Sequence, residues 1–211
     1  MARHVPVLPA EVLHWLDPQP GQTIVDCTVG AGGHARLIAE RVMPGGRVIG
    51  LDQDPAMLDL ARPWLAGLSV TLIHAAFDQL ADALRDQGVK AVDGVLADLG
   101  VSSDQLDNPA RGLSFQHDAP LDMRMDPTRG ETAADLLRRL PERDLADLIY
   151  QFGEERFSRR IARRIVEARE KTPIETTGQL ADLVRRCVPR PKGRAGGIDP
   201  ATRTFQALRI A

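Results

Sequence analysis

The sequence predicts an α/β fold in which a parallel sheet is followed by a segment made of helices alone. Over the first hundred residues, short apolar runs alternate with stretches of helical spacing. After Asp98 this alternation stops, and beyond residue 130 only helical spacing remains. Strands that alternate with helices form right-handed βαβ units, whose strands are parallel. The 211 residues suffice for one such domain, or for a smaller one with an insertion.

The expected strands are apolar runs, each followed by a polar or glycine-containing segment. Between them, apolar residues recur at helical spacing, as in Met57, Leu58 and Ala61 after Pro55, which suits a first helical turn. Gly88 is expected to end the third helix. The predicted strands are 23–26, 47–51, 70–73 and 94–97, and the predicted helices between them are 34–42, one starting near 55, and 78–87.

Residues 100–130 are rich in Asp, Pro, Ser and Gly and are predicted to form an ordered loop region. Two capping boxes, Thr132 with Asp135 and Thr176 with Gln179, indicate helix starts beyond it. The predicted helices are 136–140, 141–152, 154–171, 176–188 and one that starts near 200 and still runs at 211. The last helix has no cap or polar tail, so we expect the chain to be cut in mid-domain.

Charge is divided unevenly along the chain. The total is 27 Lys+Arg against 29 Asp+Glu, a net −2. Residues 1–105 hold 7 basic and 13 acidic residues, and residues 106–211 hold 20 and 16, giving −6 and +4. Residues 156–194 alone hold 12 and 4, giving +8. These numbers suit a cationic or small ligand in front and a polyanion behind, but solvated helix faces in an Arg-rich chain explain them equally well.

Composition excludes several classes of protein. The near-zero balance excludes a uniformly basic coat protein for nucleic acid, and 43% hydrophobic residues exclude an acidic disordered chain. No apolar run is long enough to span a bilayer, and the N-terminus lacks a secretory signal. Cys27 and Cys187 are too few for a disulfide scaffold or a zinc site, and the histidines show no metal spacing. We therefore expect a cytoplasmic protein without a metal.

A ligand site is predicted where the first strand ends. Gly30, Gly32 and Gly33 follow that strand and open a helix, so a ligand can approach bare main chain. Asp52 ends the second strand, where it can accept hydrogen bonds from two ribose hydroxyls. Together they predict an adenosine-containing ligand. Tight packing of helix on strand is the alternative explanation of the glycines.

Two details bear on which ligand this is. The dinucleotide fingerprint G-x-G-x-x-G lacks its third glycine here, where Ala35 stands, although alanine is tolerated. Asp26, just before the turn, would repel a diphosphate but attract the amino group and sulfonium of S-adenosylmethionine. Charge complementarity therefore favours S-adenosylmethionine over NAD.

Other candidate residues keep two interpretations each. Phe77, after the third strand, either borders the adenine or packs in the core. His34 either touches the cofactor carboxylate or caps its helix. Asp98 lies beyond the fourth strand, where chemistry gathers in such sheets. It either holds an amine N–H, turning the lone pair toward the methyl group, or only binds cofactor or caps the loop.

Five segments carry a resemblance to a known family. They are 26–35 (DCTVGAGGHA), 94–106 (GVLADLGVSSDQL), 121–127 (LDMRMDP), 153–164 (GEERFSRRIARR) and 201–210 (ATRTFQALRI). In these segments the chain resembles the bacterial 16S ribosomal RNA (cytosine-N4)-methyltransferase family RsmH, also called MraW. The resemblance implies a class I (Rossmann-like) S-adenosylmethionine-dependent methyltransferase fold, with a parallel sheet interrupted by an all-helical insertion. Family members continue past residue 211, so we expect later strands to be missing and one flank of strand 94–97 to be exposed.

The resemblance also implies residue roles. The cofactor is S-adenosylmethionine, and its contacts fall on Gly32, Gly33, His34, Asp52, Phe77, Asp98 and Gln105, beside Gly30 of the same turn. The substrate is a cytosine in the decoding region of 16S rRNA within the small ribosomal subunit. Arginines and a lysine are expected to hold RNA phosphates: Arg124, Arg129, Arg156, Arg160, Arg164, Arg190, Lys192 and Arg194. The expected domains are 1–105 for the cofactor, 106–199 for RNA, and 200–211 as the start of a return to the first.

Two other functions stay open beside methyl transfer. The chain is a binding module that holds S-adenosylmethionine, and RNA with it, without turnover if missing strands complete the pocket. The other alternative is an NAD-dependent oxidoreductase, which Asp26 and the missing third glycine disfavour.

Overall fold

The computed structural model describes residues 6–189 and 197–211. The chain forms two compact units, Met1–Gly100 and Val101–Ala211. The division falls five residues before the predicted boundary at 105. Residues 200–211, expected to begin a return to the first domain, pack inside the second unit, where Ala201, Phe205 and Leu208 join its core.

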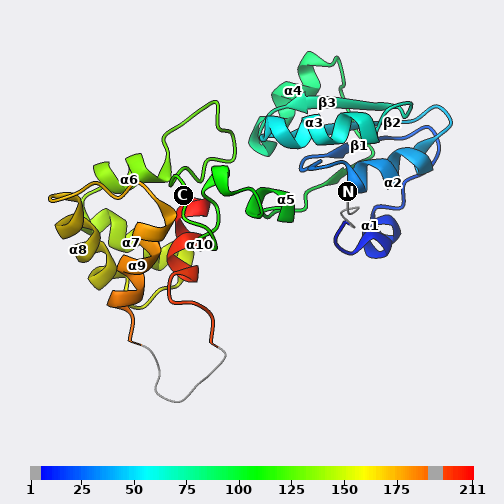
Figure 1. The fold of residues 1–211 in the computed structure, drawn as a ribbon. Helices are drawn as coiled ribbons and strands as arrows, with labels where there is room; N and C mark the ends of the chain where they lie inside the picture. The colour runs from blue at the N-terminus through cyan, green and yellow to red at the C-terminus, as the bar shows by residue number, and fades with distance from the viewer. Residues whose placement is uncertain (1–5, 190–196) are drawn as a thin grey trace. The chain divides into compact units, whose positions relative to one another are not determined.

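The first unit contains a four-stranded parallel sheet. Its strands are β1 (Thr23–Asp26), β2 (Arg47–Asp52), β3 (Val70–His74) and β4 (Gly94–Leu96). Their order in space is β3-β2-β1-β4, with β1 in parallel register to both β2 and β4 (Figure 1). β4 is an edge of this described sheet, and Val95 on it is 48% exposed, as the sequence predicts for its flank.

Both faces of the sheet are covered, which explains why the strands read as continuous apolar runs. On one side, Ile24 and Val48 pack with α2 (Gly33–Val42) and α3 (Pro55–Trp64). On the other, their neighbours Val25 and Ile49 pack with the segment that contains α4 (Leu80–Asp86). Successive strand residues thus alternate between two cores. Asp26 and Asp52 end β1 and β2, and Asp98 follows two residues after β4.

Two features of this unit differ from the sequence prediction. A helix at Pro9–Leu16, α1, was not predicted, and its N-cap Leu8 has no side-chain cap hydrogen bond to announce it. The helix predicted at 78–87 divides into a 3₁₀ turn, η1 (Phe77–Gln79), and α4. Gly88 follows with φ of +66°, which fits its predicted role as a helix end.

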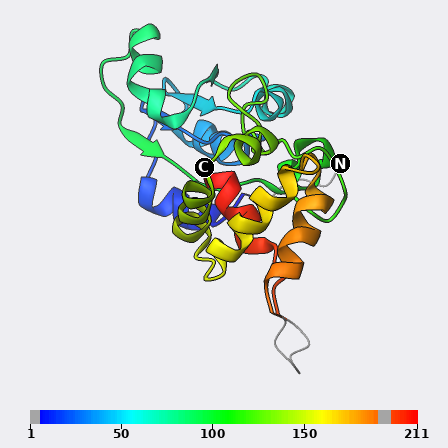
Figure 2. The same cartoon turned by 90° about the vertical axis from the view of Figure 1, so that its left-hand side faces the viewer.

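The second unit is helical. Its helices are α5 (Ser103–Leu106), η2 (Pro109–Arg111), α6 (Ala133–Arg139), α7 (Glu142–Gly153), α8 (Ser158–Arg169), α9 (Thr177–Cys187) and α10 (Thr202–Ile210). Both predicted capping boxes form, at Thr132 and Thr176. The helix predicted at 154–171 starts later, because Glu154 adopts φ of +51° as the C-cap of α7. Figures 1 and 2 show α8 and α9 side by side.

The loop region at 100–130 is ordered by backbone hydrogen bonds, as expected, although it contains the unpredicted α5 and η2. The amide of Leu121 donates to the carbonyl of Glu175, and that of Met123 donates to the carbonyl of Arg111. Leu121 and Met123 are buried in the core of the unit. The loop is therefore part of the packed structure of this unit.

Substituting Gly153 by alanine is expected to destabilise the second unit by about 1–3 kcal/mol. A Cβ at this position would overlap the backbone carbonyl of Arg203 in α10, which has no side-chain freedom to move away. A urea titration followed by circular dichroism measures the change. Gly197→Ala is the matched control, because a Cβ there meets open space. Equal midpoints for the two variants would contradict the assignment of a tight α7–α10 contact.

No helix within 6–189 and 197–211 is both long and apolar enough to cross a membrane. Cys27 and Cys187 are buried free thiols, one in each unit. Burial raises the pKa of both thiols, so neither has the character of an activated nucleophile.

Candidate cofactor site and cationic surface

The glycine turn after β1 combines open space with close packing. Gly30 has φ of +51°, and a Cβ there would meet nothing nearer than 3.9 Å. Gly32 has φ of +91°, and a Cβ there would lie 3.2 Å from Leu65. Gly33 is similarly close to Pro6, at 3.2 Å. Packing thus accounts for Gly32 and Gly33, whereas the bare main chain at Gly30 leaves space for a ligand.

Asp52, at the end of β2, is tied to this turn. Its Oδ2 accepts a hydrogen bond of 2.8 Å from the amide of Gly30, and its Oδ1 accepts one of 2.9 Å from the amide of Asp54. Burial raises the pKa of Asp52, and the two amide donors oppose that rise. The carboxylate therefore fixes the glycine turn. Each oxygen keeps a second lone pair with which to accept a ligand hydroxyl.

Asp26, at the end of β1, is fully buried. Its Oδ1 accepts a hydrogen bond of 3.1 Å from the amide of Thr28, but its Oδ2 is buried with no hydrogen-bond partner among the described residues. Burial, together with the charges of Asp52 and Asp98, raises its pKa to about 7. Three carboxylates thus converge where the strands end, and an unpaired buried oxygen among them suits a cationic ligand.

His34 and Asp98 lie together at the same edge of the sheet. His34, in the first turn of α2, is buried, and its Nε2 lies 3.7 Å from Oδ2 of Asp98. The Asp98 side chain is 46% exposed, and its amide donates to Oγ1 of Thr28 at 2.8 Å. Thr28 is a positioning residue that sequence reasoning missed, because this hydrogen bond joins residues 70 positions apart. The arrangement leaves the Asp98 carboxylate accessible to a substrate.

Phe77 and Gln105, both predicted to contact the cofactor, differ in burial. Phe77 begins η1 and is 53% exposed, which excludes the core-packing alternative. Gln105 belongs to the second unit and is buried, and its Oε1 accepts from the amide of Ser102 in a capping box. Its cofactor contact therefore stays a prediction from the resemblance. Ser102 and Gln105 form this box together, and Ser102 was not among the predicted site residues.

Several of the predicted RNA-binding arginines have intramolecular partners. Arg124 forms a bidentate ion pair with Asp122, at 2.8 and 2.7 Å, and this pair holds the pKa of Asp122 below its usual range. With its side chain only 25% exposed, Arg124 orders the loop. Arg129 pairs with Asp126 at 3.2 Å.

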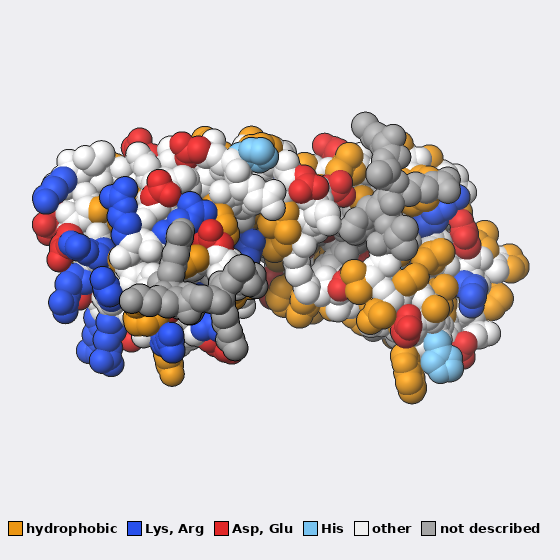
Figure 3. Space-filling model, turned by 60° about the horizontal axis from the view of Figure 1, so that its bottom comes forward, with side chains coloured by type: hydrophobic (Ala, Val, Ile, Leu, Met, Phe, Trp, Pro, Cys, Tyr) orange, Lys and Arg blue, Asp and Glu red, His pale blue; other side chains and the backbone are white. Residues whose placement is uncertain are grey.

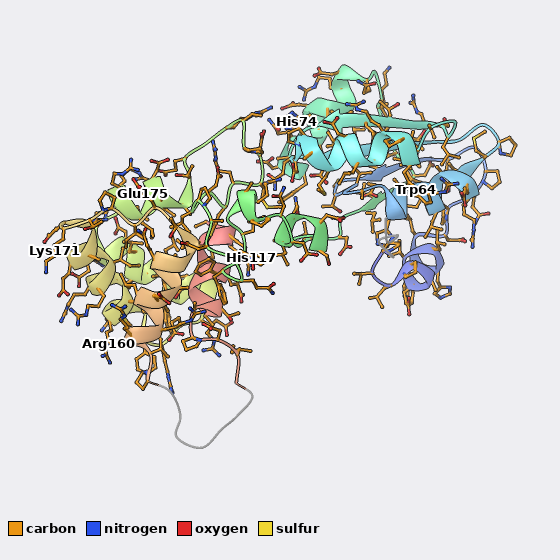
Figure 4. The ribbon with its side chains drawn as sticks, viewed as in Figure 1. Trp64, His74, His117, Arg160, Lys171 and Glu175 are labelled. Carbon is orange, nitrogen blue, oxygen red and sulfur yellow. The ribbon has the colours of Figure 1, made fainter. Side chains whose placement is uncertain are left out.

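The predicted arginines of the α8 region are more available. Arg164 pairs with Glu167 at 2.7 Å but is 62% exposed, and Arg156 lies over the ring of Phe157 at 4.9 Å. Arg160 has no ion-pair partner among the described residues and lies at the outer edge of the unit (Figure 4). Lys and Arg side chains gather over this unit (Figure 3). Arg190, Lys192 and Arg194 lie outside the described residues.

The order β3-β2-β1-β4, the glycine turn after β1 and the carboxylate that ends β2 are the arrangement of a Rossmann-like nucleotide-binding fold, the fold class of S-adenosylmethionine-dependent methyltransferases. Within that class, the chain belongs to the MraW methylase family, whose model matches residues 1–211.

Curated relatives agree with this family. A protein named ribosomal RNA small subunit methyltransferase H from Geotalea uraniireducens is 51% identical over 210 residues, 99% of this chain and 67% of its own. One of the same name from Sorangium cellulosum is 54% identical over 213 residues, 99% of this chain and 66% of its own. The chain thus spans about two thirds of these relatives. Among solved structures, TrmN from Thermus thermophilus matches 47% of this chain and 30% of its own, with 29% identity and a TM-score of 0.38.

Proposed function

We propose that this chain is the cofactor-binding and RNA-facing part of a cytoplasmic enzyme that methylates N4 of a cytosine in the decoding region of 16S rRNA. The observation that carries the proposal is the family match over residues 1–211, together with relatives named as small-subunit rRNA methyltransferases. As domains, we propose 1–105 for the cofactor and 106–199 for RNA, with 200–211, which pack in the second unit, leading back toward the first.

S-adenosylmethionine, when bound, supplies a methyl group on a positively charged sulfur. The residues proposed to hold it are Gly30, Gly32, Gly33, His34, Asp52, Phe77, Asp98 and Gln105. Asp52 accepts from the ribose hydroxyls, and the exposed ring of Phe77 borders the adenine. The buried, unpaired Oδ2 of Asp26 supports a cationic ligand, because it would repel a diphosphate.

Asp98 is proposed to orient the acceptor amine. The N4 lone pair of cytosine is delocalised into the ring, so an acceptor that holds one N–H helps to turn the lone pair toward the methyl group. His34 positions Asp98 through their 3.7 Å contact. In the transfer, the N4–C bond forms as the C–S bond breaks, and a proton leaves N4 for solvent. The target base must leave its stack, at a cost of a few kcal/mol.

Incubation with tritiated S-adenosylmethionine and small subunits from cells lacking this methylation tests the function. We expect label in 16S rRNA that migrates, after digestion to nucleosides, as N4-methylcytidine. Subunits that already carry the methyl group are the control and are expected to take up no label. If the chain binds S-adenosylmethionine but transfers no label, it is a binding module and the catalytic proposal is overturned. Binding of NAD in competition with S-adenosylhomocysteine would favour the oxidoreductase alternative.

A further inference from the structure

A groove lies between α8 and α9 in the second unit, and residues 171–174, which join the two helices, form part of its lining. Its volume is about 570 Å³. Three cationic side chains line it: Arg164 from α8, Lys171 from the turn and Arg186 from α9. Lys171 and Arg186 were not among the residues predicted to bind RNA.

Two of these cations are not neutralised by the protein. Glu167 and Asp182 also line the groove, but Glu167 pairs with Arg164 at 2.7 Å and Asp182 pairs with Arg185 at 3.1 Å. Lys171 and Arg186 are exposed and have no ion-pair partner in the described part of the chain. The groove therefore carries uncompensated positive charge at its rim.

The surroundings strengthen this field. Burial raises the pKa of Cys187, which lines the groove, while Arg160 and Arg164 oppose that rise and Glu167 adds to it. The charges of Arg160 and Arg164 thus reach the base of the groove. Residues 156–189 together hold nine basic and four acidic side chains, a net +5. Figure 4 shows Arg160 and Lys171 at the outer edge of this unit.

The floor of the groove is apolar. Ile174 and Cys187 are buried, and Ala168 and Leu183 are half-buried beside them. A phosphate alone needs no apolar floor, and an apolar peptide needs no cationic rim. A nucleotide of an unpaired RNA strand matches both, because its base can lie on apolar surface while its phosphates meet Lys and Arg.

Resting on the proposed function, we propose that the groove between α8 and α9 binds an unpaired nucleotide of the 16S rRNA substrate, with its phosphates on Lys171 and Arg186 and its base over Leu183 and Ile174. This assigns the second unit a defined RNA contact, separate from the carboxylate cluster in the first unit. Arg160 and Arg164 extend the contact to the neighbouring phosphates.

The salt dependence of binding tests the phosphate contacts. Replacing Lys171 and Arg186 together by glutamine keeps much of each stem and removes two charges. For single-stranded RNA, we expect the slope of log K against log salt to become shallower by about 1.4, and affinity for unmethylated small subunits at 0.1 M salt to fall about 20-fold. Arg138→Gln with Arg143→Gln removes the same charge from exposed positions on α6 and α7, and is expected to leave the slope unchanged.

Photocrosslinking tests the identity of the occupant. Thr172, exposed and lining the groove, is replaced by p-benzoylphenylalanine, and the full chain is irradiated with small subunits. We expect a crosslink to 16S rRNA. A crosslink to a ribosomal protein alone, or no crosslink from a variant with unchanged melting, overturns the proposal.

The two proposals fail in different ways. If the unaltered chain neither binds small subunits nor transfers methyl groups, the proposed function fails. If it does both while the Lys171 and Arg186 double variant keeps the original salt slope, only the groove proposal fails.

Discussion

Replacing Asp52 by alanine is expected to weaken binding of S-adenosylmethionine by about a hundredfold or more. The carboxylate is proposed to accept both ribose hydroxyls, and hydrogen bonds to a charged group contribute about 1.5–3 kcal/mol each. Loss of two such bonds therefore corresponds to at least about 3 kcal/mol, or roughly a hundredfold in affinity. Isothermal titration calorimetry with S-adenosylmethionine measures the change.

The structure gives this substitution a second consequence. Asp52 also accepts from the amides of Gly30 and Asp54, so alanine leaves both donors without this partner. The glycine turn then loses the contact that holds it against β2. For this reason we expect Asp52→Ala to weaken binding of the whole cofactor, even if a part of the cofactor that lacks the ribose still binds weakly.

Two further variants separate binding from folding. Asp59→Ala removes an exposed carboxylate from α3, where its partner is the exposed Arg62, and is expected to bind the cofactor normally. Asp52→Asn keeps one acceptor oxygen and the shape of the side chain, and its affinity should fall between those of the other two. An unchanged enthalpy and affinity for Asp52→Ala would remove Asp52 from the proposed site.

The sheet could be predicted from the sequence because its strands are short apolar runs between turn residues. The strand predicted at 23–26 has the bounds of β1, and the others differ by about one residue at an end. α1 was missed because it begins at a left-handed Leu8 with no side-chain cap, so nothing local announces it. The start of α8 was missed because Glu154 takes a positive φ, which is uncommon for glutamate and cannot be expected from the sequence.

The site was less predictable than the sheet. The glycine turn and Asp52 were visible because strand ends and glycines recur at a known spacing. The neutralisation of Arg124 by Asp122 was not, because it depends on a loop ordered by distant backbone contacts. Likewise, charge counting placed the cations of the second unit but did not separate paired Arg164 from unpaired Lys171 and Arg186.

Replacing Asp26 by asparagine is expected to change the free energy of unfolding, relative to the unaltered chain, by about 3 kcal/mol more favourably at pH 8 than at pH 4.5. The pKa of Asp26 is about 7 in the folded protein, against 3.8 as the ordinary value. Between these two values the folded state holds a proton that the unfolded state has lost. The unaltered chain therefore loses stability as pH rises from about 4 to 7, and loses no more above that range.

The variant lacks this titrating group. The informative quantity is therefore the free energy of unfolding of the variant minus that of the unaltered chain, followed as a function of pH. The asparagine oxygen can still accept from the amide of Thr28, while its NH₂ replaces the unpartnered Oδ2. A buried NH₂ without a partner costs about 1–3 kcal/mol, but equally at every pH. Urea titrations at pH 4.5, 6, 7 and 8 measure the difference, and parallel curves would show that folding does not raise the pKa of Asp26.

The same variant is expected to lose affinity for S-adenosylmethionine. Its loss of affinity for S-adenosylhomocysteine should be smaller, because only S-adenosylmethionine carries a sulfonium charge that faces Asp26. The Asp26 carboxylate is buried without a partner and lowers the stability of the folded chain near neutral pH. A cationic ligand would explain this arrangement, because its charge would take the place of the missing partner. Adding S-adenosylmethionine should then flatten the pH dependence of the unaltered chain, because a bound cation lowers the pKa of Asp26. Equal losses of affinity for both ligands would contradict this account.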